Sequence, residues 1–161
     1  EPLRQKKLLD FISKVKELGY LVKLDTNGFY PIKLEKLIED GLLDYIAMDI
    51  KSSADKYALA TGVDKVDVKK VNQSIELLQR NQVAYEFRTT AVKGIHTLED
   101  FEKIALWIEA SPRYYIQNFV DSADILSFRR EPKTSLEPFS KEELEEILQV
   151  VKKRLPQAQI R

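Results

Sequence analysis

The stretch YLVKLDTNG, residues 20–28, decides the fold, because a run typical of a β-strand ends abruptly in the polar residues DTNG. The same change recurs in YIAMDIK (45–51), YEFRTTA (85–91) and YYIQNF (114–119). Burying a charge without a partner costs several kcal/mol. We therefore expect Asp49, Lys51 and Arg88 to interact with a ligand or with another charged group. The strand ends therefore predict the functional site.

Composition and charge narrow the class of protein. The chain has 161 residues, of which 43% are hydrophobic and 32% charged, as in an ordinary globular domain with one core. Its 26 basic residues balance 26 acidic ones, so no net field attracts a polyanion, and we expect no nucleic acid partner. No apolar run is long enough to predict a membrane partner.

The chain contains no cysteine. This excludes a disulfide framework, a thiolate zinc site and a cysteine-ligated iron–sulfur cluster within these residues. A reducing cytoplasmic location fits this composition. The chain begins at Glu1 rather than Met, and we expect that a leader or a longer segment has been removed.

Helical and strand periods alternate along the chain. One helix is expected from Pro2 to Gly19, a second from Pro31 to Gly41, and a third with Val71, Ile75 and Leu78 on its buried face. Thr97 with Asp100, and Ser140 with Glu143, predict capped helix starts. Strands are expected at 20–24, 45–50, 83–91 and near 114. Residues 120–139 lack a clear period and are expected to form a long loop, of the kind that serves as a lid, a binding loop or a disordered segment.

The strand ends recur at about the length of one strand–helix unit, which predicts parallel strands joined by right-handed helical crossovers. The two-residue strand period gives each strand one polar and one apolar face, as in a barrel whose lumen holds a polar ligand. A closed eight-stranded barrel needs about 250 residues. We therefore predict an α/β fold with an incomplete parallel (β/α) partial barrel of about four strands and outer helices.

Five motifs together resemble the radical S-adenosylmethionine (SAM) activating enzymes. They are Glu1-Pro2 at a helix start, LDTNG (24–28), MDIK (48–51), FRTT (87–90) and IQNF (116–119). The resemblance spans nearly the whole chain and is greatest to activating proteins of anaerobic ribonucleoside-triphosphate reductase, with pyruvate formate-lyase activators next.

The resemblance implies a six-stranded partial barrel, in which a three-cysteine loop after the first strand holds a 4Fe-4S cluster and a Gly-Gly-Glu-Pro motif ends the second strand. Residues 1–161 would then be the C-terminal part of one such domain, beginning inside that motif. Two strands, the cluster loop and roughly 60 or more residues would precede them. No residue of this chain would ligate the cluster.

The resemblance also assigns residues to the SAM site. Glu1 would belong to the motif that receives the methionyl ammonium, and Lys51 would pair with the methionyl carboxylate. A monovalent cation beside that carboxylate would be held by an oxygen-rich corner formed from Asp25, Thr26, Asp49 and the carbonyl of Ala47. Asn27 would also belong to the SAM-binding set, and Arg88 and Gln117 would lie further around the lumen, near the cofactor or the docked substrate peptide.

The implied function is activation of a glycyl-radical enzyme. Reductive cleavage of SAM makes a 5′-deoxyadenosyl radical, which abstracts hydrogen from a glycine of the partner, and the electron comes from a flavodoxin or ferredoxin. Pyruvate formate-lyase activators carry a histidine after the last of these strands, where this chain has Val120. This departure favours anaerobic ribonucleotide reductase as the partner, and the chain alone is expected to be inactive.

Other interpretations of the same residues stay open. Residues 25–28 could form a turn with an Asx hydrogen bond and a left-handed glycine. Asp49 and Lys51 could form a structural ion pair with each other or with Arg88 and Glu86. His96 is expected to be a solvated residue near a helix start.

At the level of the whole chain, the alternative function is a non-catalytic parallel α/β module that binds a small anion or a partner protein. In either case the strand at 20–24 is expected to be an unprotected edge through which the chain associates with a second chain.

Overall fold

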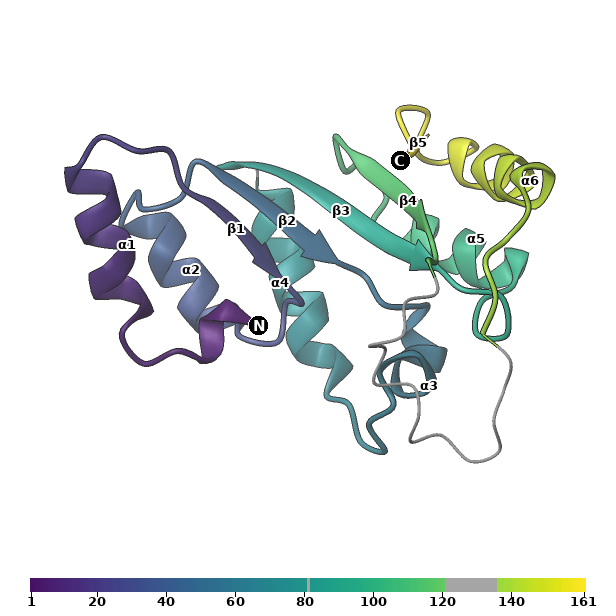
Figure 1. Ribbon diagram of the computed structural model, residues 1–161, viewed down its shortest axis with the longest axis horizontal. Helices are drawn as coiled ribbons and strands as arrows, with labels where there is room; N and C mark the ends of the chain where they lie inside the picture. The colour runs from purple at the N-terminus through teal and green to yellow at the C-terminus, as the bar shows by residue number, and fades with distance from the viewer. Residues whose placement is uncertain (81, 121–135) are drawn as a thin grey trace. The chain divides into compact units, whose positions relative to one another are not determined.

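A computed structural model describes residues 1–80, 82–120 and 136–161. Helices and strands alternate along it (Figure 1). The helical elements are η1 (Pro2–Arg4), α1 (Leu8–Glu17), α2 (Pro31–Glu39), η2 (Ala54–Lys56), α3 (Tyr57–Thr61), α4 (Val68–Gln79), α5 (Leu98–Trp107) and α6 (Lys141–Lys152). The strands are β1 (Lys23–Thr26), β2 (Tyr45–Asp49), β3 (Ala84–Ala91), β4 (Tyr114–Asn118) and β5 (Gln159–Ile160).

The strands form one sheet in the order β1-β2-β3-β4-β5, so that β1 is an edge strand. β1 pairs in parallel with β2, with Leu24 opposite Ile46 and Asp25 opposite Ala47. β4 pairs in parallel with β5. The predicted parallel α/β fold with outer helices is confirmed. The described residues contain five strands where about four were expected, because the two residues of β5 are too few to give a readable strand period.

The chain divides into two compact units, each described here in its own terms. Unit 1 contains residues 1–49 and 67–87, and unit 2 contains residues 50–66 and 88–161. β3 contributes residues to both.

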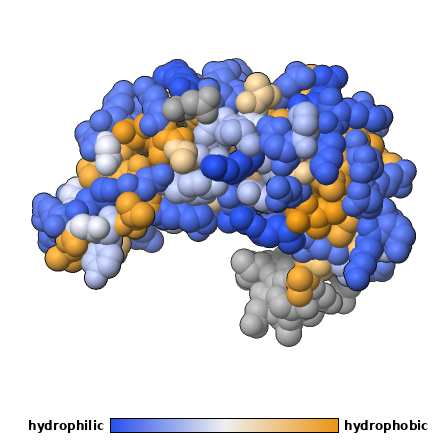
Figure 2. Space-filling model, turned by 90° about the horizontal axis from the view of Figure 1, so that it is seen from above, coloured by the Kyte–Doolittle hydropathy of each residue, from blue (hydrophilic) through white to orange (hydrophobic). Residues whose placement is uncertain are grey.

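The helix expected from Pro2 to Gly19 is wrong in its first turns. Pro2 opens the short 3-10 helix η1, and α1 begins only at Leu8. Of the apolar residues in α1 only Ile12 is buried, whereas Phe11 and the C-cap residue Leu18 are exposed. Apolar surface is visible at the left of Figure 2, on the side where Figure 1 draws α1.

The core of unit 1 lies between α2, α4 and the first two strands. Leu34 and Leu37 of α2 and Val71, Ile75 and Leu78 of α4 are fully or almost fully buried. Leu24, Ile46 and Met48 complete this core from β1 and β2. The helical period of α4 is confirmed, because three to four residues per turn bring these side chains to one face.

Both predicted capping boxes are present in unit 2. The Thr97 side chain accepts from the backbone at Asp100, and the Asp100 side chain accepts from the backbone of Thr97. Ser140 and Glu143 repeat this exchange at the start of α6. These caps depend on residues only three positions apart, which is why the sequence shows them. Of the loop expected at residues 120–139, residues 121–135 lie outside the described part of the chain.

The turn after β1 depends on a close approach to the backbone of Gly28. Gly28 has φ +74°, and a Cβ atom there would lie 2.1 Å from the terminal methyl of Met48. Its carbonyl accepts a 2.8 Å hydrogen bond from the buried hydroxyl of Ser74 on α4. A side chain at this position is therefore excluded both by the backbone conformation and by the packing of Met48.

Replacing Gly28 by alanine should destabilise the chain more than the same change at Gly41. The left-handed backbone costs about 1 kcal/mol net at either position. At Gly28 the methyl group of Met48 must also move within a filled core, which adds about 1–3 kcal/mol. Urea unfolding measures the difference.

Gly41→Ala is the matched control, because Gly41 has φ +65° but nothing within 4 Å of an added Cβ. Equal losses of unfolding free energy in the two variants would show that the Met48 contact contributes nothing.

Candidate functional site

Glu1 joins the start of the chain to the end of β1. Its carboxylate accepts from the Leu3 amide at 3.0 Å and from the Asn27 amide at 2.7 Å. The Thr26 hydroxyl lies 3.1 and 3.2 Å from the two carboxylate oxygens. An ionised carboxylate offers about four acceptor positions, so these donors use most of them.

The strand end itself forms a hydrogen-bonded turn. The Asn27 side-chain oxygen accepts from the Phe29 amide at 3.1 Å, and the Thr26 hydroxyl accepts from the Gly28 amide at 3.2 Å. The interpretation of residues 25–28 as an Asx turn with a left-handed glycine is therefore confirmed as geometry. It describes how the backbone is held and leaves the carboxylate of Asp25 outside the turn.

Asp25 and Thr26 lie on opposite faces of β1. Asp25 is exposed and its carboxylate pairs with Lys23 at 2.9 Å, whereas Thr26 is only 4% exposed and packs inward. Asp25 lies opposite Ala47 of β2, and Asp49, two residues further along β2, shares the face of Ala47. The structure thus brings Asp25, Ala47 and Asp49 to one face of adjacent strands, and the hydroxyl of Thr26 to the other.

Glu86 of β3 is buried in unit 1 with a specific partner. It is 3% exposed and accepts a 2.8 Å hydrogen bond from the phenol of Tyr45 on β2. This contact satisfies part of the charge that the sequence places inside an apolar strand.

In unit 2 the backbone around Lys51 is held by groups that are distant in the sequence. The Ile50 amide donates to the Arg88 carbonyl at 2.7 Å, and the Lys51 amide donates to the Tyr57 phenol at 3.3 Å. The Lys51 carbonyl lies 2.9 Å from Nε2 of His96. Both backbone groups of Lys51 are therefore bonded to side chains rather than to a neighbouring strand.

The prediction that His96 is solvated is wrong, because His96 is only 6% exposed. Its Nδ1 accepts from the Val92 amide at 3.1 Å, and its ring packs against Phe101 with centroids 5.5 Å apart. Burial is the largest influence on its pKa and lowers it, only partly offset by the hydrogen bonds to Lys51 and Val92 and by the charge of Asp100. His96 is thus a buried, neutral residue.

Asp100 ties the segment after Lys51 to the start of α5. Its fully buried carboxylate accepts from the Ser53 hydroxyl at 3.0 Å, from Lys56 Nζ at 2.8 Å and from the Thr97 amide at 2.8 Å. Burial alone would raise the pKa of Asp100. The hydrogen bonds from Lys56, Thr97 and Ser53 outweigh it, so the pKa lies below its usual 3.8.

Arg88 and Gln117 are half-buried residues of β3 and β4 in unit 2. Arg88 contributes its carbonyl to the Ile50 amide. Beyond Gln117, the Asn118 side chain bonds both backbone groups of Phe139, at 2.8 and 3.0 Å.

The structure brings the predicted site residues together in two separate sets. In unit 1, Glu1, Thr26 and Asn27 are in contact, and Asp25 and Asp49 lie on adjacent strands. In unit 2, Lys51 and Arg88 are linked through Ile50, and Gln117 lies on β4. Sequence reasoning missed His96 and Tyr57, whose contacts with Lys51 span 45 and 6 residues. Only the capping box directly after His96 gave a local signal there.

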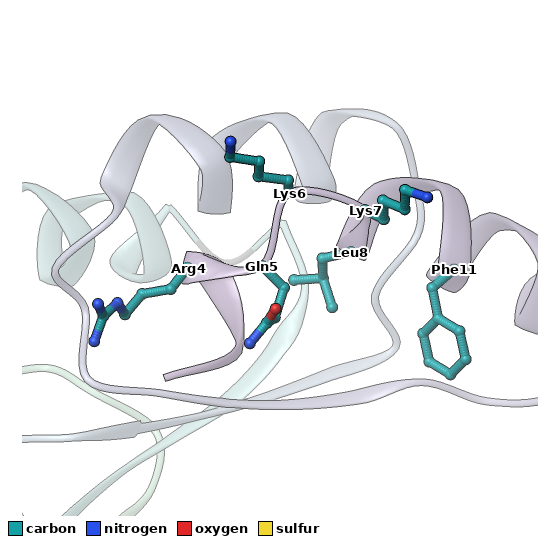
Figure 3. A pocket seen from close by; sticks show the side chains of 6 residues that line it. All are labelled: Arg4, Gln5, Lys6, Lys7, Leu8 and Phe11. Carbon is teal, nitrogen blue, oxygen red and sulfur yellow. The ribbon is translucent and has the colours of Figure 1, made fainter.

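An open hollow in unit 1 lies away from these residues. Figure 3 shows that its lining side chains come from the end of η1 and the start of α1, and include Arg4, Gln5, Leu8 and Phe11. None of the predicted site residues lines it. Its lining is cationic and apolar and belongs to the exposed side of α1.

Among residues 1–80, 82–120 and 136–161, no group of three or more His, Cys, Asp or Glu side chains could hold a metal ion. Within the same ranges no helix has the length and apolar character needed to cross a membrane.

Known proteins resemble this chain in sequence and in structure. No family model matches the chain. The chain is 36% identical over 172 aligned positions to a protein of Methanocaldococcus jannaschii named "Putative glycyl-radical enzyme activating enzyme", and the match covers 100% of this chain and 67% of that protein. A crystal structure of a domain of pyruvate-formate lyase-activating enzyme from Bacteroides vulgatus matches with a TM-score of 0.77 and 15% identity, covering 100% of this chain and 94% of that one. The second similarity concerns the fold alone.

Asp100→Asn should destabilise the chain and flatten its stability profile in acid. Removing the charge weakens four hydrogen bonds in a buried position, from Ser53, from Lys56 and from the amide and hydroxyl of Thr97, which costs about 1–3 kcal/mol near neutral pH. Because the folded pKa of Asp100 is depressed, its contribution is present above pH 3.8 and is lost as the pH falls through the folded pKa. Urea unfolding between pH 3 and 7 should therefore show the two proteins converging at the acid end.

Asp55→Asn is the matched control. A hydrogen bond from Lys103 lowers the pKa of Asp55 to about 2, but both side chains are exposed, so solvent screens the pair. An equal loss of stability in both variants would contradict the special role of Asp100.

Proposed function

Because the chain belongs to the family of glycyl-radical enzyme activating enzymes, we propose that it forms the C-terminal part of a single radical SAM domain that activates anaerobic ribonucleoside-triphosphate reductase. The observation that carries the proposal is the arrangement after β2, where Asp49 ends a strand and the backbone of Lys51 is held at both its amide and its carbonyl. Family membership favours this function over a non-catalytic anion-binding or protein-binding module.

Lys51 fits the methionyl carboxylate of SAM. An ammonium group is a compact point charge that suits a small anion, and the side chain is half-buried, which reduces screening by water. Its backbone is fixed independently of any ligand, so little conformational freedom is lost on binding. Arg88 and Gln117 are proposed to contact the cofactor or the substrate peptide.

Glu1 and Asn27 are proposed to act mainly by shaping the site. The Glu1 carboxylate already accepts from Leu3, Thr26 and Asn27, which leaves limited capacity for the methionyl ammonium. A Glu1 contact to that ammonium would therefore add to the hydrogen bonds by which Glu1 already holds the end of β1.

A monovalent cation beside the carboxylate is proposed at Asp25, Thr26, Ala47 and Asp49. Asp25 lies opposite Ala47 on the face shared with Asp49, and carboxylate and carbonyl oxygens suit hard cations. Because the Thr26 hydroxyl bonds Glu1 and Gly28 on the opposite face, Thr26 would contribute its carbonyl oxygen.

The 4Fe-4S cluster of the intact protein would have to take its ligands from outside these 161 residues, which include no cysteine. When bound beside a reduced cluster, SAM supplies the radical that abstracts hydrogen from a glycine of the partner. The residues of this chain would position SAM and keep water away from it. The 161 residues alone are proposed to be inactive.

The partner and setting are proposed from the sequence. Val120, in place of the histidine of pyruvate formate-lyase activators, favours the reductase as substrate. The electron donor would be a flavodoxin or ferredoxin in the cytoplasm. The edge position of β1 supports self-association of the isolated chain.

Lys51→Ala should weaken SAM binding by the cluster-loaded protein by about 1.5–3 kcal/mol, the range for a hydrogen bond to a charged group. Calorimetric titration measures the affinity, and urea unfolding should show an unchanged fold. Lys69→Ala removes an exposed cation of α4 and should leave the affinity unchanged. If Lys51→Ala binds SAM as tightly as the parent, Lys51 is not in the site.

The substrate assignment is tested by spin resonance. The cluster-loaded protein, with SAM and reduced flavodoxin, should produce a glycyl radical signal on anaerobic ribonucleoside-triphosphate reductase and none on pyruvate formate-lyase. A signal on the lyase alone would support the radical SAM activity but would contradict the assignment of the reductase as the partner.

A further inference from the structure

Lys51, the second residue after β2, has its backbone hydrogen bonds outside the strand ladder. β2 ends at Asp49, so the amide and carbonyl of Lys51 no longer belong to the strand ladder. Backbone groups in a partly buried position need other hydrogen-bond partners. At Lys51 these partners are the phenol of Tyr57 and the ring of His96, and the second contact is the shorter, 2.9 Å against 3.3 Å.

We infer that His96 is a positioning residue for the SAM site, which holds the carbonyl of Lys51 so that the Lys51 ammonium meets the methionyl carboxylate. The inference rests on the proposed role of Lys51 in binding SAM. His96 itself does not contact the cofactor in this arrangement, because both ring nitrogens are bonded to backbone groups.

The hydrogen bonds define the tautomer of His96. The Val92 amide can only donate, so Nδ1 must be the unprotonated acceptor. The proton then lies on Nε2, which donates to the Lys51 carbonyl. A protonated ring would turn a second donor toward the Val92 amide and break that contact.

The surroundings of the ring keep it in this neutral form. Phe101 packs against one side, and burial lowers the pKa of His96. Asp100 and Lys56 are the charged groups that act on the ring from α5 and η2, and they oppose each other, since Asp100 raises the pKa and Lys56 lowers it. Nε2 therefore stays a donor to Lys51 at neutral pH.

His96 is itself fixed by the start of α5. The capping box of Thr97 and Asp100 sets the backbone directly after it, and Asp100 also binds Ser53 and Lys56 from the segment that follows Lys51. The segment 51–56 is thus attached to the start of α5 at three positions. The position of the Lys51 backbone therefore depends on the position of α5.

Two substitutions of His96 separate its two hydrogen bonds. The amide oxygen of asparagine can take the place of Nδ1 and keep the Val92 contact, but asparagine is too short to reach Lys51. The longer glutamine places an amide donor near the position of Nε2. His96→Asn should therefore release Lys51, and His96→Gln should largely restore it.

Hydrogen exchange tests the structural step without any ligand. In His96→Asn the Lys51 and Ser52 amides should exchange about 5- to 10-fold faster than in the parent, as expected for the loss of one hydrogen bond. In His96→Gln they should exchange at nearly the parent rate. Nitrogen NMR of the parent should show the proton on Nε2.

SAM titration of the cluster-loaded protein tests the functional step. His96→Asn should weaken binding about 5- to 10-fold and His96→Gln much less. A proton on Nδ1, unchanged exchange in His96→Asn, or equal affinities of His96→Asn and the parent would each overturn the inference.

The two proposals fail in different ways. If Lys51→Ala weakens binding but His96→Asn does not, the proposed function stands and the positioning role is lost. If Lys51→Ala has no effect on binding, the proposed role of Lys51 falls together with the functional part of the inference. The exchange rates still decide whether His96 holds Lys51.

Discussion

The structure depends on how each parallel strand satisfies its backbone where it leaves the sheet. Beyond the last ladder bond the freed amides and carbonyls need partners, and after β1 and β2 side chains supply them. After β1 they are Glu1 and Ser74, and after β2 they are Tyr57 and His96. At the end of β4 the roles are reversed, because the Asn118 side chain binds the backbone of Phe139. Some of the polar residues at these ends therefore have a structural task, whatever further role they have.

Residues 25–28 were interpreted either as a turn or as part of a binding site, and the structure shows that the two interpretations are compatible. A turn and a binding site compete only if the same atoms serve both. In the turn the bonded atoms are the hydroxyl of Thr26, the side-chain oxygen of Asn27 and the backbone of Gly28. The carboxylate of Asp25 lies on the other face of the strand, opposite Ala47. The turn thus fixes the strand end from which Asp25 projects.

The sequence predicted those features whose causes are local. The capping boxes at Thr97 and Ser140 and the buried face of α4 follow from residues three or four positions apart. The parallel fold followed from the spacing of polar strand ends. β1 was expected at residues 20–24 but spans Lys23–Thr26, because its register is set by β2, about 20 residues further on.

Long-range contacts explain what the sequence could not show at the candidate site. His96 precedes a helix cap, a position usually open to solvent, and only the fold reveals that the Lys51 carbonyl and the Val92 amide fill its hydrogen-bonding capacity. The same lesson applies to Glu1, whose partners Thr26 and Asn27 lie 25 and 26 residues away. In both cases the structural role of a polar residue depends on a hydrogen bond to a backbone group that is distant in the sequence, and no sequence pattern indicates that bond.

Lys51 shows how a strand end can be held at its backbone before any ligand is present. Its amide donates to the phenol of Tyr57 and its carbonyl lies 2.9 Å from Nε2 of His96, so neither contact depends on what the side chain binds. These contacts fix the point at which the side chain leaves the backbone, while the side chain keeps its own rotamers. If Lys51 binds SAM as proposed, the backbone contacts reduce the part of the entropy loss that comes from ordering the chain.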